Sequence, residues 1–158
     1  MHWRSRGMRR WNRWARNEDG SAALEFITVG VILLVPLVYL VIALGAIQEQ
    51  TFGAEAAARH TARAIAMAPD AAAGEARGEA VLAGVVEEYG LDPASVDVSL
   101  SCTPAGVPCP SAGATIVVTV STRVQLPLVP AILGLDRATA IPVEAEAAQK
   151  VSRSWGAE

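Results

Sequence analysis

The sequence is poor in the side chains from which most catalytic and cofactor-binding sites are built. Aromatic residues make up 5% of the 158 residues, and there are two histidines and two cysteines. The motifs GxSxG and HExxH and the P-loop pattern are absent from it, so no recognisable hydrolase, zinc peptidase or nucleotide-binding site is present. Aspartate and histidine are too scarce for a clustered catalytic site, and aromatics for a large cofactor pocket. We therefore expect a protein that is not an enzyme and has no cofactor or metal ion.

Acidic residues are missing from the first part of the chain. Residues 1–17 contain six arginines and no acid, whereas residues 48–158 contain thirteen acidic and seven basic side chains. Tryptophans interleave with these arginines, which suits a tail on the anionic inner surface of a membrane with its rings at the headgroup level. Nucleic-acid binding is the alternative for such a tail. Membrane topology explains the arginines without it, so we expect no nucleic-acid partner.

Charge is also missing from Phe26 to Ile47, a run of 22 residues. At about 1.5 Å per residue this run spans roughly 33 Å as a helix, enough to cross the core of a bilayer. One alternative is a buried helix of a soluble protein, which is usually shorter and keeps a polar stripe. Another is a cleaved secretory signal, whose apolar part is usually shorter. The membrane helix is the preferred interpretation.

The arginines that precede the run predict its direction in the membrane. Positive charge favours the cytoplasmic side, so we expect a single-pass protein of the cell membrane with a cytoplasmic N-terminus. The chain then divides into a basic cytoplasmic leader (1–20), a transmembrane helix (21–47) and an extracytoplasmic domain (48–158). At this length the chain has room for one small domain beside the membrane segment.

A glycine and a glutamate stand at the start of the apolar run, in the stretch DGSAALEFI of residues 19–27. A carboxylate in the first turn of a helix is favoured by the helix dipole, and this is the plain interpretation of Glu25. The surrounding sequence adds further features to this glutamate. In order they are an arginine-rich tail, Gly20, four residues, Glu25, Phe26 and an unbroken apolar segment. This order resembles the type IV prepilin signal. The spacing GxxxxEF is similar to that of the tight-adherence (Flp) pilus system, in which the TadE and TadF pseudopilins carry it.

The resemblance to the TadE-like family implies roles for these residues. A prepilin peptidase would cut after Gly20, so that Ser21 becomes the N-terminus and Glu25 the fifth mature residue. Glycine suits such a site because it lacks a Cβ atom. The new amine and the Glu25 carboxylate would lie one helical turn apart or meet between subunits. Gly20 and Ser21 would form the processing site, and Glu25 and Phe26 would act in assembly. The implied partners are the membrane, the peptidase, other pilins and pseudopilins, and the pilus assembly machinery.

Beyond the apolar run the sequence predicts a small α+β domain. The first helix is expected to run from about Ala22 to Ala68, where Pro69 ends it, and a second helix from Ala71 to Tyr89 with Gly90 as its cap. The hydrophobic period then changes from 3.6 to 2, which predicts three short strands near residues 96–102, 115–121 and 140–146. Pro142 favours an edge position for the third. The expected fold is a long N-terminal transmembrane helix that continues outside the membrane, a second short helix and a small three-stranded antiparallel sheet.

Two loops of this domain have distinctive compositions. Cys102 and Cys109 lie in a proline- and glycine-rich loop between the first two strands, and outside the cell they can form a disulfide. A metal site is the alternative, but it needs more ligands than two cysteines, and His2 and His60 lie elsewhere. The stretch QLPLVPAILGLD between the second and third strands is apolar and rich in turns. We expect it to pack on the sheet or to touch the membrane or a partner.

Three functions remain open at this point. The first is a TadE-like minor pilin or pseudopilin that supports assembly of a tight-adherence pilus. The second is an uncleaved, signal-anchored extracytoplasmic binding domain unrelated to pili, in which Gly20 and Glu25 are replaceable. The third is a secreted enzyme with an unrecognised site, which would be released into the medium and would have a pocket with clustered polar groups.

Overall fold

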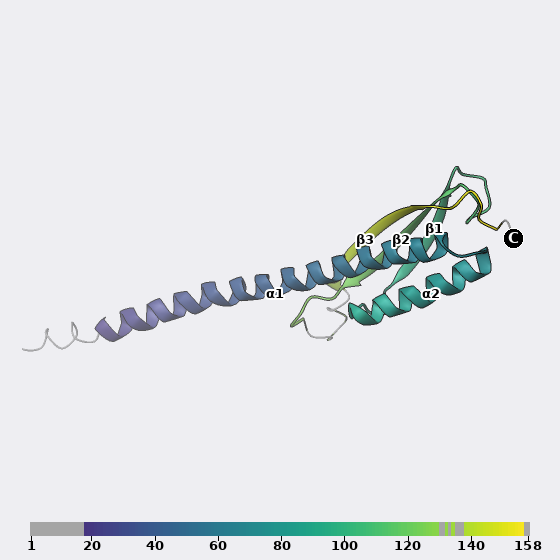
Figure 1. The fold of residues 1–158 in the computed structure, drawn as a ribbon. Helices are drawn as coiled ribbons and strands as arrows, with labels where there is room; N and C mark the ends of the chain where they lie inside the picture. Colours follow the sequence, from purple (N-terminus) through teal and green to yellow (C-terminus); the bar gives the residue numbers. More distant parts are fainter. Residues whose placement is uncertain (1–17, 130–131, 133, 135–137, 157–158) are drawn as a thin grey trace, which may run out of the picture. The chain divides into compact units, whose positions relative to one another are not determined.

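The computed structural model describes residues 18–129, 132, 134 and 138–156, which form two helices and one sheet (Figure 1). The elements in chain order are α1 (Glu18–Ala66), α2 (Ala71–Glu88), β1 (Asp97–Thr103), β2 (Thr115–Val124) and β3 (Ile141–Lys150). The basic tail of residues 1–17 lies outside the described part. The chain divides into two units, Met1–Ile42 and Ala43–Glu158. The expected α+β class, with a long N-terminal helix, a shorter helix and a three-stranded antiparallel sheet, is confirmed.

The first helix is close to the one that the sequence predicts. α1 begins at Glu18, earlier than the expected Ala22, and ends at Ala66, slightly before the expected Ala68. Pro69 disfavours the helical conformation of Ala68, the residue directly before it, so the helix ends ahead of that residue. Pro36 lies inside α1, and the helix continues past it.

Local capping fixes both ends of the second helix. The Asp70 carboxylate accepts a hydrogen bond from the backbone N–H of Ala73 at 2.8 Å, which satisfies one of the free donors of the first turn. At the other end Gly90 has a φ of 59°, the left-handed conformation that favours glycine after a helix. The second helix starts at Ala71, as predicted, and ends at Glu88, one residue before the predicted Tyr89, which is its C-cap; Gly90 follows directly in the left-handed conformation.

The sheet has the strand order β1-β2-β3, and both neighbouring pairs are antiparallel. β3 is an edge strand, as Pro142 predicts. In the register of the sheet, Leu100 of β1 lies opposite Val118 of β2, and Val120 of β2 lies opposite Ala145 of β3. β2 and β3 each contain 10 residues and are longer than the alternating segments that predicted them. Backbone pairing between the two strands continues where the alternation of apolar side chains has already become weak.

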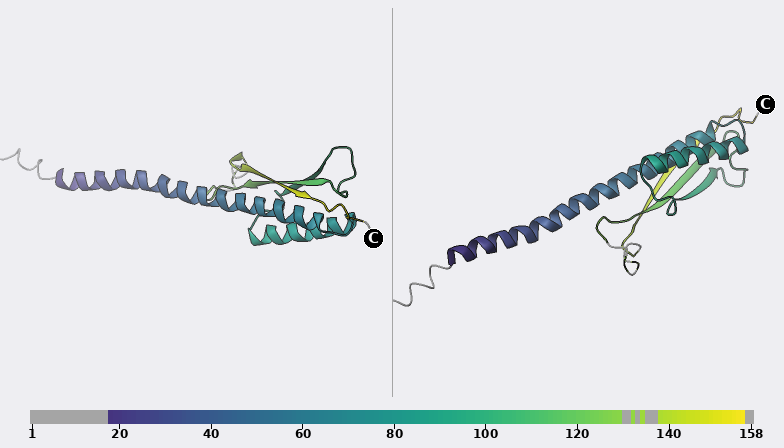
Figure 2. Two further views of the ribbon diagram at one scale, coloured as in Figure 1. Left: turned by 45° about the horizontal axis from the view of Figure 1, so that its top comes forward. Right: turned by 90° about the horizontal axis from the view of Figure 1, so that it is seen from below.

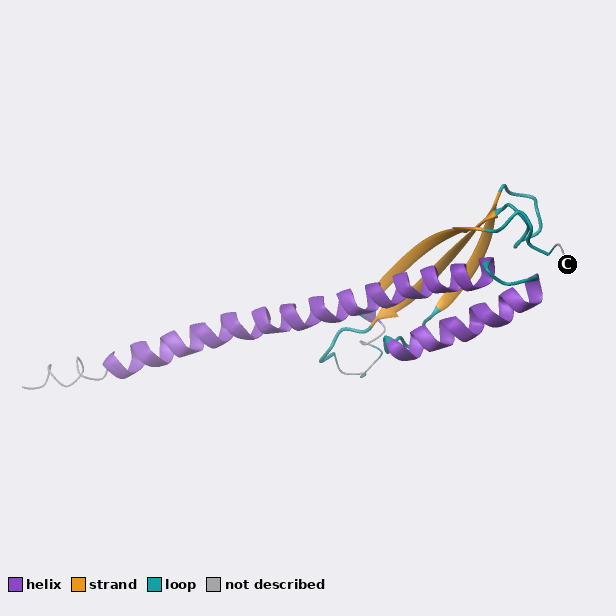
Figure 3. Cartoon of the chain, in the orientation of Figure 1, coloured by secondary structure: helices purple, strands orange, loops and turns teal. Residues whose placement is uncertain are grey.

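Both helices lie on one face of the sheet, which leaves the other face open (Figure 2, Figure 3). The core between the layers contains Ile116, Val118 and Val120 of β2, all of them 0% exposed. α1 contributes mainly small side chains to it, namely Ala54, Ala57, Ala58, Ala62, Ile65 and Ala66. Alanines on this side of the helix let its backbone approach the sheet closely at interior packing density.

A glycine marks the closest approach of α1 to the segment that follows α2. A Cβ atom at Gly53 would lie 2.9 Å from the Cβ atom of Tyr89 and 3.0 Å from Cδ2 of Leu91. Ordinary van der Waals contact between such atoms begins at about 3.5 Å. Any larger residue at this position therefore forces the two segments apart.

Candidate functional site

The four residues to which the family resemblance gives a role all lie in α1: Gly20, Ser21, Glu25 and Phe26. Ser21 and Glu25 are exposed, and their spacing of one helical turn, about 6 Å of rise, puts them on the same side of the helix. Phe26 is 80% exposed. The helix thus brings these side chains to the start of the apolar surface, while their roles in cleavage and assembly stay predictions.

Glu25 is the sole charged residue between Ser21 and Gln48. Its side chain is exposed, and it makes no ion pair with another described residue. Because α1 begins at Glu18, Glu25 lies beyond the first turn, and the predicted stabilisation of its carboxylate by the helix dipole does not apply to this helix. An amine within one turn would supply a direct partner. The arrangement can therefore hold one positive charge.

The helix that follows Glu25 presents large apolar side chains on all sides. Leu33 is 66% exposed and Leu37 57%. α1 is long and apolar enough to cross a membrane, and only 6% of its most apolar window is buried by the rest of the described chain. A core helix of a soluble protein would be mostly buried, so that alternative does not fit. A signal sequence near the N-terminus has the same properties as a membrane span.

Cys102 and Cys109 form the predicted disulfide, with their Cα atoms 5.6 Å apart. Cys102 is the penultimate residue of β1, so the bridge closes the turn-rich loop that leads to β2. It ties the end of the edge strand β1 to the loop that follows it.

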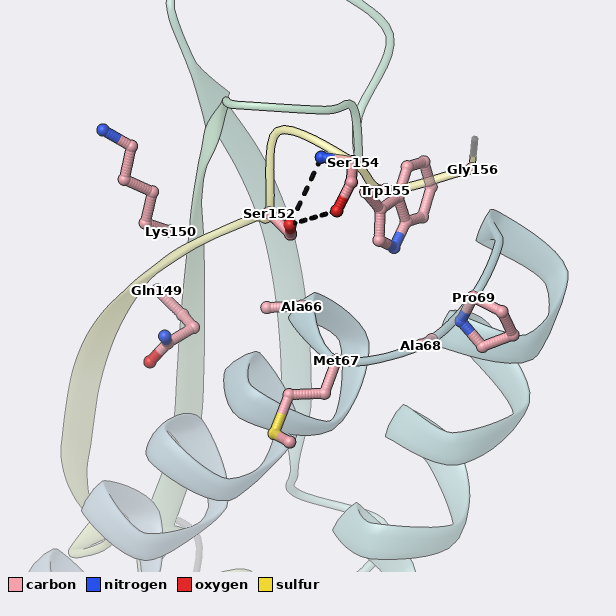
Figure 4. A pocket seen from close by; sticks show the side chains of 10 residues that line it. All are labelled: Ala66, Met67, Ala68, Pro69, Gln149, Lys150, Ser152, Ser154, Trp155 and Gly156. Atoms are coloured by element: carbon pink, nitrogen blue, oxygen red, sulfur yellow. Dashed lines mark hydrogen bonds between the residues drawn. The ribbon is translucent and has the colours of Figure 1, made fainter. Parts of the chain in front are cut away.

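A cavity of about 470 Å³ lies between the end of α1 and the segment after β3 (Figure 4). Trp155 and Met67 form part of its wall, and the hydroxyls of Ser152 and Ser154 lie 2.9 Å apart beside them. A nucleophilic serine needs a neighbouring general base. Among the described residues that line the cavity there is no histidine and no carboxylate, and Lys150 is the basic one.

Other polar side chains that could titrate lie on the surface of the described domain. His60 is exposed on α1, and the acid pairs Glu87–Glu88 and Glu144/Glu146 are exposed as well, as expected for solvated faces. Within the described ranges, no three His, Cys, Asp or Glu side chains gather to hold a metal ion.

The sequence did not reveal a groove between α2 and β1. Val98 and Leu100 face the same side as the buried residues of β2, yet each is 41% exposed. The groove has a volume of about 550 Å³ and is also lined by Leu82 and Thr61. The Thr61 hydroxyl is buried and has no hydrogen-bond partner among the described residues. Alternation in β1 identifies the apolar side of the strand, but it carries no information on what covers that side.

Comparisons of the chain with protein-family models, with curated proteins and with solved structures found no match. The resemblance to the TadE-like family is therefore a similarity of sequence pattern between Gly20 and Ile47, without a detected relative to support it.

Proposed function

We propose that the protein is a TadE-like minor pilin or pseudopilin that supports assembly of a tight-adherence pilus. It is a single-pass membrane protein with a cytoplasmic N-terminus, and a prepilin peptidase removes its leader after Gly20. Its work is the lateral packing of α1 and the presentation of a small α+β domain outside the cell membrane. One observation carries the proposal: Gly20, Glu25 and Phe26 stand together directly before an exposed apolar helix surface.

The exposed surface of α1 supports a helix that is surrounded by lipid or by other helices. Leu24 is 67% exposed and Phe26 80%, and comparable values continue along the helix to Leu44 at 48%. A contiguous apolar surface of this size is not stable in water. Lipid covers it in the single protein, and equivalent helices of neighbouring subunits replace part of that lipid in an assembly.

The position of Glu25 supports processing on the cytoplasmic side. A carboxylate at the centre of a membrane helix costs about 2.5 to 3.5 kcal/mol, and less near the interface. Cleavage after Gly20 creates an amine on Ser21, one turn from this carboxylate. Pairing the two charges, within one helix or between neighbouring helices, removes two isolated charges from an apolar setting and fixes the axial register of adjacent subunits.

The proposal is tested by replacing Glu25 in cells that lack their own copy of the gene. We expect Glu25→Ala to abolish or strongly reduce surface filaments counted by electron microscopy. Glu49→Ala is the matched control, because Glu49 is an exposed acid of the same helix beyond the apolar run, and it should leave the filaments intact. Normal filaments with both Glu25→Ala and Gly20→Val would show an uncleaved, anchored domain without a role in pilus assembly.

A further inference from the structure

The described residues between β2 and β3 lie at the end of the domain where the chain enters through α1. One surface pocket brings together residues of α1 and of the end of β2, namely Ala46, Glu49, Gln50, Arg123, Val124 and Gln125. At the opposite end, Ala66 and Met67 lie beside Gln149 and Lys150. β2 therefore runs antiparallel to this part of α1. The described part of the β2–β3 connection follows at the end of the sheet away from the C-terminus, as Figure 1 and Figure 2 show.

Two described residues of the connection expose large aliphatic side chains at that end. Leu128 is 82% exposed and Ile132 is 61% exposed. The sequence contains no charged residue from Gln125 to Leu135. The exposed Leu128 and Ile132 therefore have no charged neighbours in this stretch of the sequence. Uncharged apolar surface that remains exposed on a small domain indicates contact with a membrane or with another molecule.

The part of α1 beside this loop lies where the apolar run ends. This run ends at Ile47, and the next charge is that of Glu49. Ala43 lies inside the run and is 7% exposed, whereas its neighbour Leu44 is 48% exposed. Another part of the domain therefore covers one side of α1 about 6 Å before the run ends. If the apolar run spans a membrane, lipid surrounds the helix at Ala43. The domain therefore extends to the depth of the lipid.

We propose that Leu128 and Ile132 insert into the extracytoplasmic interface of the bilayer, so that lipid acyl chains cover them. This inference rests on the membrane span proposed above. Interfacial segments bury their apolar side chains about 5–10 Å into the headgroup and acyl boundary, which matches the level at which Ala43 is covered. Arg123 is exposed at the start of the connection, where its guanidinium can meet lipid phosphates. The domain is then held at the membrane by two elements, α1 and this loop, which restricts its rotation about the helix.

Fluorescence quenching in the full chain reconstituted into lipid nanodiscs tests this contact. A polarity-sensitive dye is attached to Leu128→Cys, and nitroxide groups are placed on the lipid chains near the headgroups. The two native cysteines do not compete for the dye, because they are joined in a disulfide. The matched control is Val107→Cys, since Val107 is an exposed apolar residue, 39% accessible, in the loop that the disulfide closes at the other end of the sheet. Leu34→Cys reports the membrane span itself.

We expect the nitroxide lipids to quench the dyes at Leu128 and Leu34 and to leave the dye at Val107 unquenched. Quenching at Leu34 with none at Leu128 overturns the loop contact and leaves the membrane span intact. No quenching at either position overturns both the span and the loop contact. A blue-shifted dye at Leu128 that lipid nitroxides do not quench overturns the proposal in favour of cover by protein, either a second copy or a partner.

Discussion

Gly53 offers a direct test of how closely α1 packs in the domain. A Gly53→Ala variant places a methyl carbon 2.9 Å from Tyr89 Cβ and 3.0 Å from Leu91 Cδ2. The Tyr89 atom is the root of its side chain, so a change of rotamer cannot move it away. Overpacking of this kind costs about 1–3 kcal/mol, whereas alanine in place of glycine inside a helix contributes about 1 kcal/mol of stability. We expect the net change in the free energy of unfolding to lie between about zero and a loss of 2 kcal/mol.

The matched control is Gly84→Ala in α2, because a Cβ atom at Gly84 meets nothing within 4 Å. This variant keeps the gain of helix propensity without the clash, and it should be more stable than the parent by about 1 kcal/mol. Thermal unfolding in detergent, followed by circular dichroism, measures both, at about 4 °C per kcal/mol for a unit of this size. The Gly53→Ala midpoint should lie about 4–12 °C below that of Gly84→Ala. Equal midpoints would refute the close packing described for Gly53.

Three further predictions concern the domain. Replacing Cys102 and Cys109 together by serine should lower the free energy of unfolding by about 2–3 kcal/mol, because the unfolded chain gains the freedom of an open loop; an unchanged thermal midpoint would contradict this. Asp70→Ala should cost about 1 kcal/mol through loss of the helix cap, whereas Asp70→Asn should cost less; the same melts measure both. Val118→Ala should cost about 2–3 kcal/mol at a fully buried position, and Val98→Ala about 1 kcal/mol at a half-exposed one. Equal losses at the two valines would show that another molecule covers the groove beside β1.

The elements that the sequence predicted well are those that local chemistry determines. Pro69 and Gly90 marked the ends of helices, and Pro142 marked an edge strand, because each of these residues restricts its own backbone or that of its neighbours. The disulfide was predictable because the two cysteines share one short loop. The residues around Gly20 could be singled out for the same reason, since a peptidase signal of the proposed kind is contiguous in the sequence, and their role in processing stays a prediction.

The features that the sequence did not predict depend on contacts between distant segments. The alanines of α1, such as Ala57 and Ala58, were expected only as part of a long helix, yet they form one wall of the core. Alanine has little hydrophobicity to mark a buried side, so its burial follows from the sheet that packs on it. The half-exposed side of β1 and the close approach at Gly53 likewise depend on where α2 and the segment after it lie.

Mass spectrometry of the N-terminal peptide, purified from membranes of cells that contain a prepilin peptidase, tests the central claim most directly. The account predicts that the mature chain begins at Ser21, that Gly20→Val keeps the leader, and that Gly30→Val, at a position with open space around it, is cleaved normally. A wild-type protein that retains residues 1–20, or a Gly20→Val protein that is processed like the wild type, would contradict it.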